Sequence, residues 1–274
     1  MLNELLEMLS YTFLLRAVIV GTLVSLCAAL LGVSLVLKRY SMIGDGLSHV
    51  GFGALAIATA LNAAPLAVSI PVVMLAAFLL LRMSSSGMLK GDAAIGLLST
   101  GALAVGVIVL SLSTGMNTEV NNYLFGSILS MSRSDVILSL AVALVVLCLF
   151  VVFYHKIFAV TFDETFARAT GTKAGAYNAL IALLTALTIV VGMRMMGSML
   201  ISGLLIFPAL SAMRLCKRFE SVIITSAVIS VFCFLCGTAA SCMLAVPTGA
   251  SVICVNIVIL LLSMLTGKLK ECVS

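Results

Sequence analysis

Asp45 and His49 stand four residues apart in a sequence that is otherwise almost entirely apolar. If this stretch is helical, the carboxylate and the imidazole lie one turn apart on a single face of the helix. A carboxylate and a neutral imidazole are ligands for Zn²⁺, Mn²⁺ and Fe²⁺, and this spacing allows both side chains to reach one ion. The pair is therefore a candidate site for a divalent metal ion.

Two ligands are too few to hold such an ion tightly. A two-fold dimer with these helices facing each other would supply two copies each of Asp45 and His49, which makes four protein ligands. Incomplete coordination suits a transport pathway, because an ion that enters must leave again. We therefore expect a transported metal rather than a permanently bound cofactor.

Two structural interpretations compete with a transport role. The imidazole can donate to the carboxylate, so that the pair only stabilises its helix. Alternatively, Asp45 is interfacial, because Lys38 and Arg39 precede it closely. Against both, an ionisable side chain inside a membrane helix costs about 2.5–3.5 kcal/mol, and such residues usually line a pathway or pair internally.

The composition identifies the environment of this pair. Hydrophobic residues make up 63% of the 274 residues and charged residues only 9%, with a mean hydropathy of +1.31. These values exclude a soluble domain of ordinary composition and indicate an integral membrane protein. The net charge of +5 does not indicate a nucleic-acid surface, because the basic residues fall in small groups between apolar runs.

The apolar runs predict an all-α polytopic fold with about nine transmembrane helices, within a range of eight to ten. Each run has the length needed to cross a hydrocarbon core of about 30 Å. The predicted spans cover 14–36, 41–60, 66–82, 93–112, 135–154, 176–193, 196–213, 221–245 and 250–266. Residues 1–12 resemble an amphipathic lead-in without a cleavable signal, and 113–134 predict a short interfacial or re-entrant helix. No linker divides the chain, so we expect a single domain over 1–274.

The basic residues predict an orientation with the N-terminus outside and the C-terminus in the cytoplasm. This orientation places most basic residues on the cytoplasmic side, as the positive-inside rule requires. They are Lys38, Arg39, Arg82, Lys90, Lys156, Arg168, Lys173, Arg214, Lys217, Arg218, Lys268 and Lys270.

Arg194 remains towards the outside, where we expect its side chain to snorkel or to cap a helix end. The methionines around it, at 193, 195, 196 and 199, predict lipid-facing positions or core packing rather than a soft-metal site.

The longest polar loop of the second half contains a segment of a different kind. Residues 162–171 (FDETFARATG) predict a short amphipathic helix, with acidic residues at its start and a glycine as its C-terminal cap. Phe162 and Phe166 would lie one turn apart, ready to enter a groove on a partner protein. An ordinary membrane-surface helix is the alternative. The chain contains no Walker A sequence, no HExxH and no GxSxG, so we expect neither an enzyme nor an ATP site.

Four stretches together resemble the permease subunits of the bacterial zinc/manganese/iron-type ABC transporters. The similarity runs over nearly the whole chain, from about residue 14 to about residue 266. The stretches are 41–49 (SMIGDGLSH), 162–171 (FDETFARATG), 191–200 (VGMRMMGSML) continuing to 204–209 (LLIFPA), and 247–250 (PTGA). The chain departs from the family in Val50, where alanine is more frequent, and in the charge of Arg194.

The resemblance implies an ABC importer permease in the bacterial cytoplasmic (inner) membrane. It implies a dimer with a second copy or a paralogue, two cytoplasmic ATPase subunits and an extracytoplasmic metal-binding protein. It also implies that Asp45 and His49 contribute to the passage of Zn²⁺, Mn²⁺ or Fe²⁺. The segment that couples to the ATPase would comprise Phe162, Asp163, Glu164, Phe166, Ala167, Arg168 and Gly171.

Two other classes of function remain alternatives to an ABC importer permease. One is an ATPase-independent secondary transporter, in which Asp45 and His49 form a proton relay. The other is a membrane scaffold that transports nothing.

Overall fold

The computed structural model describes residues 12–85, 91–113, 126 and 133–273, and every regular element in these ranges is a helix. Nine helices of 18 or more residues fall in the described ranges. They are α2 (Thr12–Leu37), α3 (Ile43–Ala60), α4 (Pro65–Ser85), α5 (Gly91–Leu112), α7 (Arg133–Val152), α10 (Ala174–Met196), α11 (Ser198–Leu215), α12 (Phe219–Leu244) and α13 (Thr248–Val273). Two short helices, α8 (Tyr154–Phe162) and α9 (Glu164–Ala169), lie between α7 and α10.

Seven of these helices are long and apolar enough to cross a membrane, so the chain is a multi-pass membrane protein. They are α2, α4, α5, α7, α10, α12 and α13. The predicted spans at 41–60 and 196–213 are also helical, as α3 and α11, but they are not among the seven. The lead-in over 1–12 and the short helix predicted within 113–134 fall almost entirely outside the described residues.

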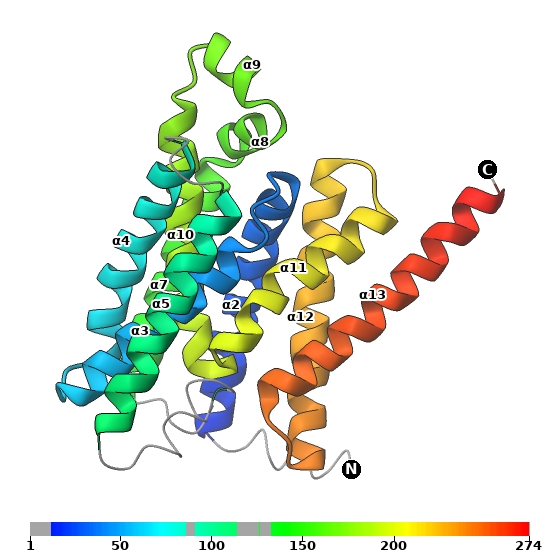
Figure 1. Ribbon diagram of the computed structural model, residues 1–274. Coiled ribbons are helices and arrows are strands. Elements are labelled where there is room, and N and C mark those ends of the chain that lie inside the picture. The colour runs from blue at the N-terminus through cyan, green and yellow to red at the C-terminus, as the bar shows by residue number, and fades with distance from the viewer. Residues whose placement is uncertain (1–11, 86–90, 114–125, 127–132, 274) are drawn as a thin grey trace.

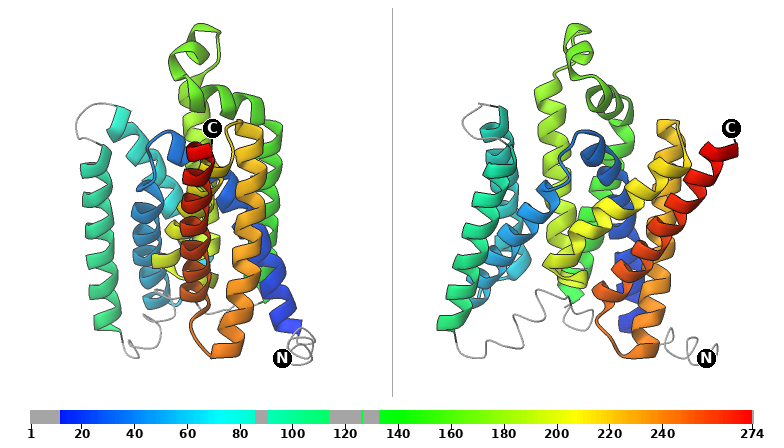
Figure 2. Two further views of the ribbon diagram at one scale, coloured as in Figure 1. Left: turned by 90° about the vertical axis from the view of Figure 1, so that its right-hand side faces the viewer. Right: turned by 45° about the vertical axis from the view of Figure 1, so that its right-hand side comes forward.

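The helices form a bundle with α2 and α10 in its interior (Figure 1). The helix α2 packs against α7, α10, α11 and α12, whereas α3 packs mainly against α4 and α5. Figure 2 shows α3, α4 and α5 grouped on one side, and α12 with α13 on the other. The largest fully buried side chains include Leu31, Leu47, Ile189 and Met193. The buried core therefore draws on α2, α3 and α10 together.

Small residues allow the closest helix contacts. This is expected in a membrane, because lipid tails are as apolar as the side chains and helix association therefore depends on close packing. A Cβ atom placed on Gly32 of α2 would lie 1.9 Å from the carbonyl oxygen of Leu205 in α11. One placed on Gly53 of α3 would lie 2.7 Å from the carbonyl oxygen of Ala102 in α5. At both contacts, only a residue without a side chain permits the observed approach of the two backbones.

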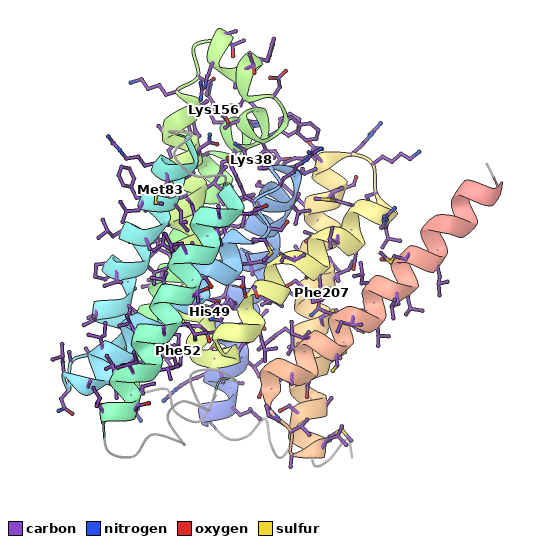
Figure 3. All side chains as sticks on the ribbon, viewed as in Figure 1. Lys38, His49, Phe52, Met83, Lys156 and Phe207 are labelled. Atoms are coloured by element: carbon purple, nitrogen blue, oxygen red, sulfur yellow. The ribbon has the colours of Figure 1, made fainter. Side chains whose placement is uncertain are left out.

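One end of the bundle gathers the polar connections, and we call it the basic end. The helices α2, α4 and α11 finish there, α10 begins there, and α8 and α9 project beyond it (Figures 1 and 2). Lys38, Met83 and Lys156 lie at this end, whereas His49 lies well away from it, within the bundle (Figure 3). Lys38 and Lys156, two of the residues predicted to face the cytoplasm, thus lie at the same end of the bundle.

Candidate metal site and coupling surface

Asp45 lies in the first turn of α3, and His49 follows one turn later on the same face. The Nε2 atom of His49 is 3.7 Å from the Oδ1 atom of Asp45. This distance exceeds that of a hydrogen bond between nitrogen and oxygen, so the imidazole does not donate to the carboxylate here. The Asp45 side chain is 39% exposed and that of His49 is 14% exposed. Both groups therefore keep unused capacity to bind a ligand.

The second ring nitrogen of His49 is also unpaired. This Nδ1 atom is buried and has no hydrogen-bond partner among the described residues. A buried polar atom without a partner costs free energy, and in a binding site this cost is offset when a ligand or ordered water arrives. The imidazole is thus not locked into a fixed role as a structural donor.

Close packing on the other faces of α3 explains why the pair is held in place. Gly44 lets the Leu205 side chain of α11 come close, since a Cβ there would lie 3.0 Å from Cδ1 of Leu205. Gly46 does the same for Ile95 of α5, with a corresponding distance of 2.7 Å. The hydroxyl of Ser48 donates to the backbone carbonyl of Asp45 over 2.8 Å. The helix is therefore clamped between α11 and α5, while its acidic side chain stays partly open.

Within the described ranges, no group of three or more His, Cys, Asp or Glu side chains is arranged to hold a metal ion. One copy of the described chain thus offers the two donors predicted from the sequence.

The thiols are outside this site, and the methionines that flank Arg194 pack in the core: Met193, Met195 and Met196 are at most 2% exposed. Of the two predicted alternatives, lipid-facing positions or core packing, these three methionines show core packing.

The segment predicted to couple to an ATPase forms two helices rather than one. Asp163 adopts an extended conformation (φ −144°, ψ 96°), and its carboxylate accepts the backbone N–H of Phe166 over 2.9 Å. This is a helix N-cap, so α9 begins at Glu164 and ends at Ala169, and Gly171 follows with φ +81°. Phe162 therefore belongs to the preceding helix α8, and the prediction of one helix over 162–171 is wrong there.

The two predicted aromatic residues are both exposed, at 60% for Phe162 and 65% for Phe166. Phe162 contacts other rings of the same chain, with centroids 4.9 Å from Phe158 and 5.6 Å from Phe219. On the opposite side of α9, Ala167 is 1% exposed and packs with Val160 and Ala174. The helix α9 thus rests on the protein through Ala167 and presents Phe166 outwards.

A polar network that the sequence does not reveal ties α9 to the bundle. The carboxylate of Glu164 accepts a hydrogen bond from the amide of Asn178 in α10 over 2.9 Å and lies 3.5 Å from the ammonium of Lys38. Lys38, at the end of α2, also donates to the Asn178 side chain and is only 8% exposed. Arg168 pairs with Glu164 over 2.5 Å. Through Glu164, the helix α9 is joined to the ends of α2 and α10.

Burial and the neighbouring charges shift the pKa values of Glu164 and Lys38 in this network. Burial by itself would raise the pKa of Glu164, but the hydrogen bond from Asn178 and the charges of Lys38 and Arg168 outweigh it and lower that pKa. Burial lowers the pKa of Lys38, and the attraction of Glu164 opposes the shift only in part. Glu164 therefore remains an anion at neutral pH and holds its partners by charge.

Arg194 is paired rather than snorkelling or capping a helix end, so that expectation is wrong. Its guanidinium donates to the carboxylate of Asp135 over 2.9 Å, and the two side chains are 9% and 16% exposed. Asp135 lies in the first turn of α7 and Arg194 in the last turn of α10. Since α7 runs towards the basic end and α10 away from it, these two turns meet at the opposite end. The sequence shows one charge of each sign near the ends of two predicted spans, but it does not show that these two ends meet.

Comparison with known proteins adds an independent observation. The model of a family described as the ABC 3 transport family matches residues 10–267. The manganese transport system membrane protein MntC of Halalkalibacterium halodurans is 28% identical over 91% of this chain and 85% of its own. The zinc uptake system membrane protein ZnuB of Haemophilus influenzae is 26% identical over 93% and 97%.

A solved structure shows a similar fold. PsaBC from Streptococcus pneumoniae, in complex with Fab, matches with a TM-score of 0.86 and 27% identity. The match covers 96% of this chain and 95% of the other.

Proposed function

Because the chain belongs to the ABC 3 transport family, we propose that it is the permease subunit of an ATP-driven importer for a divalent transition metal ion. The observation that carries this proposal is the Asp45–His49 pair, held inside a multi-pass helical bundle with its donor atoms unpaired by hydrogen bonds. Relatives named for manganese, zinc and iron transport support a metal of this class. The comparisons do not support an ATPase-independent secondary transporter.

In this proposal, Asp45 and His49 are ligands that the ion meets on its way through the bundle. Two donors from one chain and two from a second permease subunit, identical or paralogous, would complete four-fold coordination. The partial exposure of Asp45 supports this arrangement, because a carboxylate that must meet an ion cannot be enclosed by its own chain. The ion is a substrate, and the site binds it loosely enough to release it.

The helix α9 is the proposed contact with a cytoplasmic ATPase subunit, which would bind and hydrolyse ATP for this non-catalytic chain. Phe166 offers an exposed aromatic anchor of the kind that fills a groove on a partner. Asp163, Ala167 and Gly171 set the boundaries and the seating of that helix. Glu164 and Arg168 stiffen it, and Lys38 connects it to the end of α2. Movement of the ATPase would thereby reach the turn that leads into α3.

The remaining features of the proposal follow from the family and from the charge distribution. The basic end faces the cytoplasm of a bacterial inner membrane, and an extracytoplasmic binding protein delivers the ion to the opposite end. All nine long helices form one transmembrane domain over residues 1–274, with α3 and α11 crossing as parts of the packed interior. ATP binding by the partner would switch the dimer between outward-open and inward-open states.

Uptake by reconstituted vesicles tests this function. Proteoliposomes are prepared with the permease in the membrane, the metal-binding protein outside, and the ATPase on the inner side. They should accumulate radioactive metal only when ATP is enclosed in the vesicles. Competition among Zn²⁺, Mn²⁺ and Fe²⁺ then identifies the substrate. Uptake that needs no ATPase and follows a pH gradient would overturn the proposal.

A further inference from the structure

A lysine ammonium is enclosed at the basic end, directly after the last residue of α2 (Figure 3). The Lys38 side chain is only 8% exposed, and its Nζ atom lies 3.5 Å from a carboxylate oxygen of Glu164 in α9. The same ammonium donates to the side-chain oxygen of Asn178 in α10. Burial of an ammonium group is costly unless the group is paired, so these two partners hold Lys38 in its position.

Asn178 completes this arrangement through the two ends of its amide. The amide nitrogen donates to the carboxylate of Glu164 over 2.9 Å, and the amide oxygen accepts from Lys38. An asparagine side chain offers a donor and an acceptor together, as a site between a carboxylate and an ammonium requires. One carboxylate of α9 is thus connected to α2 and to α10.

These two connections lead from α9 to α3 by routes of different length. Along α10, a close contact with α3 lies at Met193, whose Cε atom would be 2.3 Å from a Cβ atom placed on Gly51. Asn178 and Met193 are fifteen residues apart, which is a rise of about 22 Å along the helix. Along α2, the path is shorter, because α3 begins at Ile43, five residues after Lys38. The route through Lys38 is therefore the more direct one.

The turn that follows Lys38 is closed by hydrogen bonds on both sides. The backbone N–H of Tyr40 donates to the carbonyl of Leu35 in α2 over 2.9 Å, and the carbonyl of Tyr40 accepts the N–H of Ile43 over 3.0 Å. The Tyr40 side chain packs against the buried core. A turn bonded in this way carries a displacement of the end of α2 into the first turn of α3, where Asp45 lies.

We propose that Lys38 is a positioning residue that links the movement of α9 to the movement of α3, and thereby ATP hydrolysis to passage of the metal ion. When the ATPase displaces α9, the carboxylate of Glu164 carries the ammonium of Lys38 and the turn behind it. This role rests on the proposed function, but it differs from docking, because Lys38 is enclosed by its own chain. Loss of Lys38 should therefore separate ATP hydrolysis from transport.

The test measures the number of metal ions taken up per ATP hydrolysed, in proteoliposomes with the ATPase and the metal-binding protein. Lys38→Gln removes the charge that joins α2 to α9. The helix α9 keeps its seat, because Asn178 and Arg168 still hold Glu164, and Ala167 still packs on the protein. ATPase co-purification and basal ATP hydrolysis should therefore stay at wild-type levels.

The ratio of ions to ATP should fall at least about fivefold in Lys38→Gln, the lower end of the usual range for coupling between two sites. Stimulation of ATP hydrolysis by the metal-loaded binding protein should be lost as well, since coupling acts in both directions. Lys38→Arg keeps a positive charge and a donor, so it should restore most of the ratio. Lys156→Gln removes an exposed lysine of α8 at the same end and should leave the ratio unchanged (Figure 3).

Lys38→Met is a second variant, which keeps an apolar stem of similar length without the charge. Replacement of a buried charge by an apolar group of similar volume is often tolerated by the fold, so this variant gives the measurement even where Lys38→Gln does not accumulate. It should lower the ratio as Lys38→Gln does.

Two results would overturn the role of Lys38. One is a wild-type ratio in both Lys38→Gln and Lys38→Met. The other is a loss of bound ATPase in proportion to the loss of uptake, with the ratio unchanged, which would show that Lys38 only holds α9 in place. Absence of ATP-driven uptake by the wild-type protein would contradict the proposed function itself, before any variant is compared.

Discussion

At the scale of single residues, the molecule depends on a few polar side chains placed in an apolar interior. Asp45 and His49 are the pair that the sequence already singles out, and the structure keeps them 3.7 Å apart without a hydrogen bond. Arg194 and Asp135 differ from that pair, because a guanidinium nitrogen of Arg194 donates to the carboxylate of Asp135 over 2.9 Å. A buried ion pair with good geometry is structural, whereas an open pair in a transporter is available to a substrate.

Substitution of the open pair should abolish transport and leave the protein intact. Asp45→Asn and His49→Ala each remove one ligand, so ATP-driven metal uptake by proteoliposomes should fall at least about tenfold. Membrane accumulation and ATPase co-purification should stay at wild-type levels. Asp92→Asn, which changes an exposed acidic residue of α5, is the matched control. Wild-type uptake by both site variants would show that the ion takes another route.

At the scale of elements, the connection between α7 and α10 is the part that reaches out of the bundle. The N-cap at Asp163 separates α8 from α9, which turns Phe166 outwards while Ala167 faces the protein. The network around Glu164 then fixes α9 against α2 and α10. A six-residue helix has little stability of its own, so these tertiary contacts determine where it lies.

Removal of the exposed ring of α9 should weaken the contact with the ATPase. Phe166→Ala deletes an aromatic anchor, and such residues typically contribute about 2 kcal/mol or more, so the affinity for the ATPase should fall about thirtyfold. Retention is measured by co-purification over a range of ATPase concentrations. Phe232→Ala in α12 removes a ring that is 55% exposed from a candidate membrane span and should have no effect. If both variants retain the ATPase equally, α9 is not the contact.

The network around Glu164 should make stability depend on pH in the acidic range. Its pKa is lowered below the ordinary value of 4.5, so the charge stabilises the fold fully above pH 4.5 and less as pH falls through the lowered pKa. The thermal midpoint of the wild-type protein should exceed that of Glu164→Gln at pH 6, and this gap should close at lower pH.

Glu220→Gln, at the start of α12 and outside this network, serves as the control and should show no such closing gap. The measurement is thermal unfolding in detergent, followed by circular dichroism. A gap between wild type and Glu164→Gln that stays constant from pH 6 to pH 3 would exclude the proposed role of the carboxylate.

At the scale of the whole molecule, glycines set how closely the helices approach. Gly32 lets α2 meet the backbone of α11, and Gly53 lets α3 meet α5. The Gly53 contact, together with those of Gly44 and Gly46, packs α3 and the candidate metal site closely against α5 and α11. The Asp45 side chain itself stays 39% exposed.

A single methyl group at the closest contact should separate two helices. In Gly32→Ala the added Cβ would lie 1.9 Å from the Leu205 carbonyl oxygen, so overpacking should cost about 1–3 kcal/mol or more. Gly101→Ala adds the same group to α5, where nothing lies within 4 Å, and should be neutral or stabilising by up to about 1 kcal/mol. The thermal midpoint and the amount accumulated in the membrane are measured. Equal midpoints would show that α2 and α11 can move apart at no cost.

Patterns that are local in the chain made much of the protein predictable from its sequence. Hydrophobic runs of sufficient length predict membrane-crossing helices, and seven of the predicted spans coincide with described helices that are long and apolar enough to cross. The spacing of Asp45 and His49 places both on one helical face, since helical geometry depends only on neighbouring residues. The resemblance carried by four short stretches agrees with the family match over residues 10–267.

Contacts between residues far apart in the chain were decided only by the tertiary structure. Lys38 and Glu164 are 126 residues apart, and Arg194 and Asp135 are 59 apart, so no local pattern predicts that they meet. The break at Asp163 was missed although it is local, since Asp is a common N-cap residue and its carboxylate accepts the N–H of Phe166 three residues later. The sequence by itself determined which side chains carry chemistry, since that depends on residue type and local spacing. The packing of α3 between α11 and α5 decided which of those side chains remain open to a ligand.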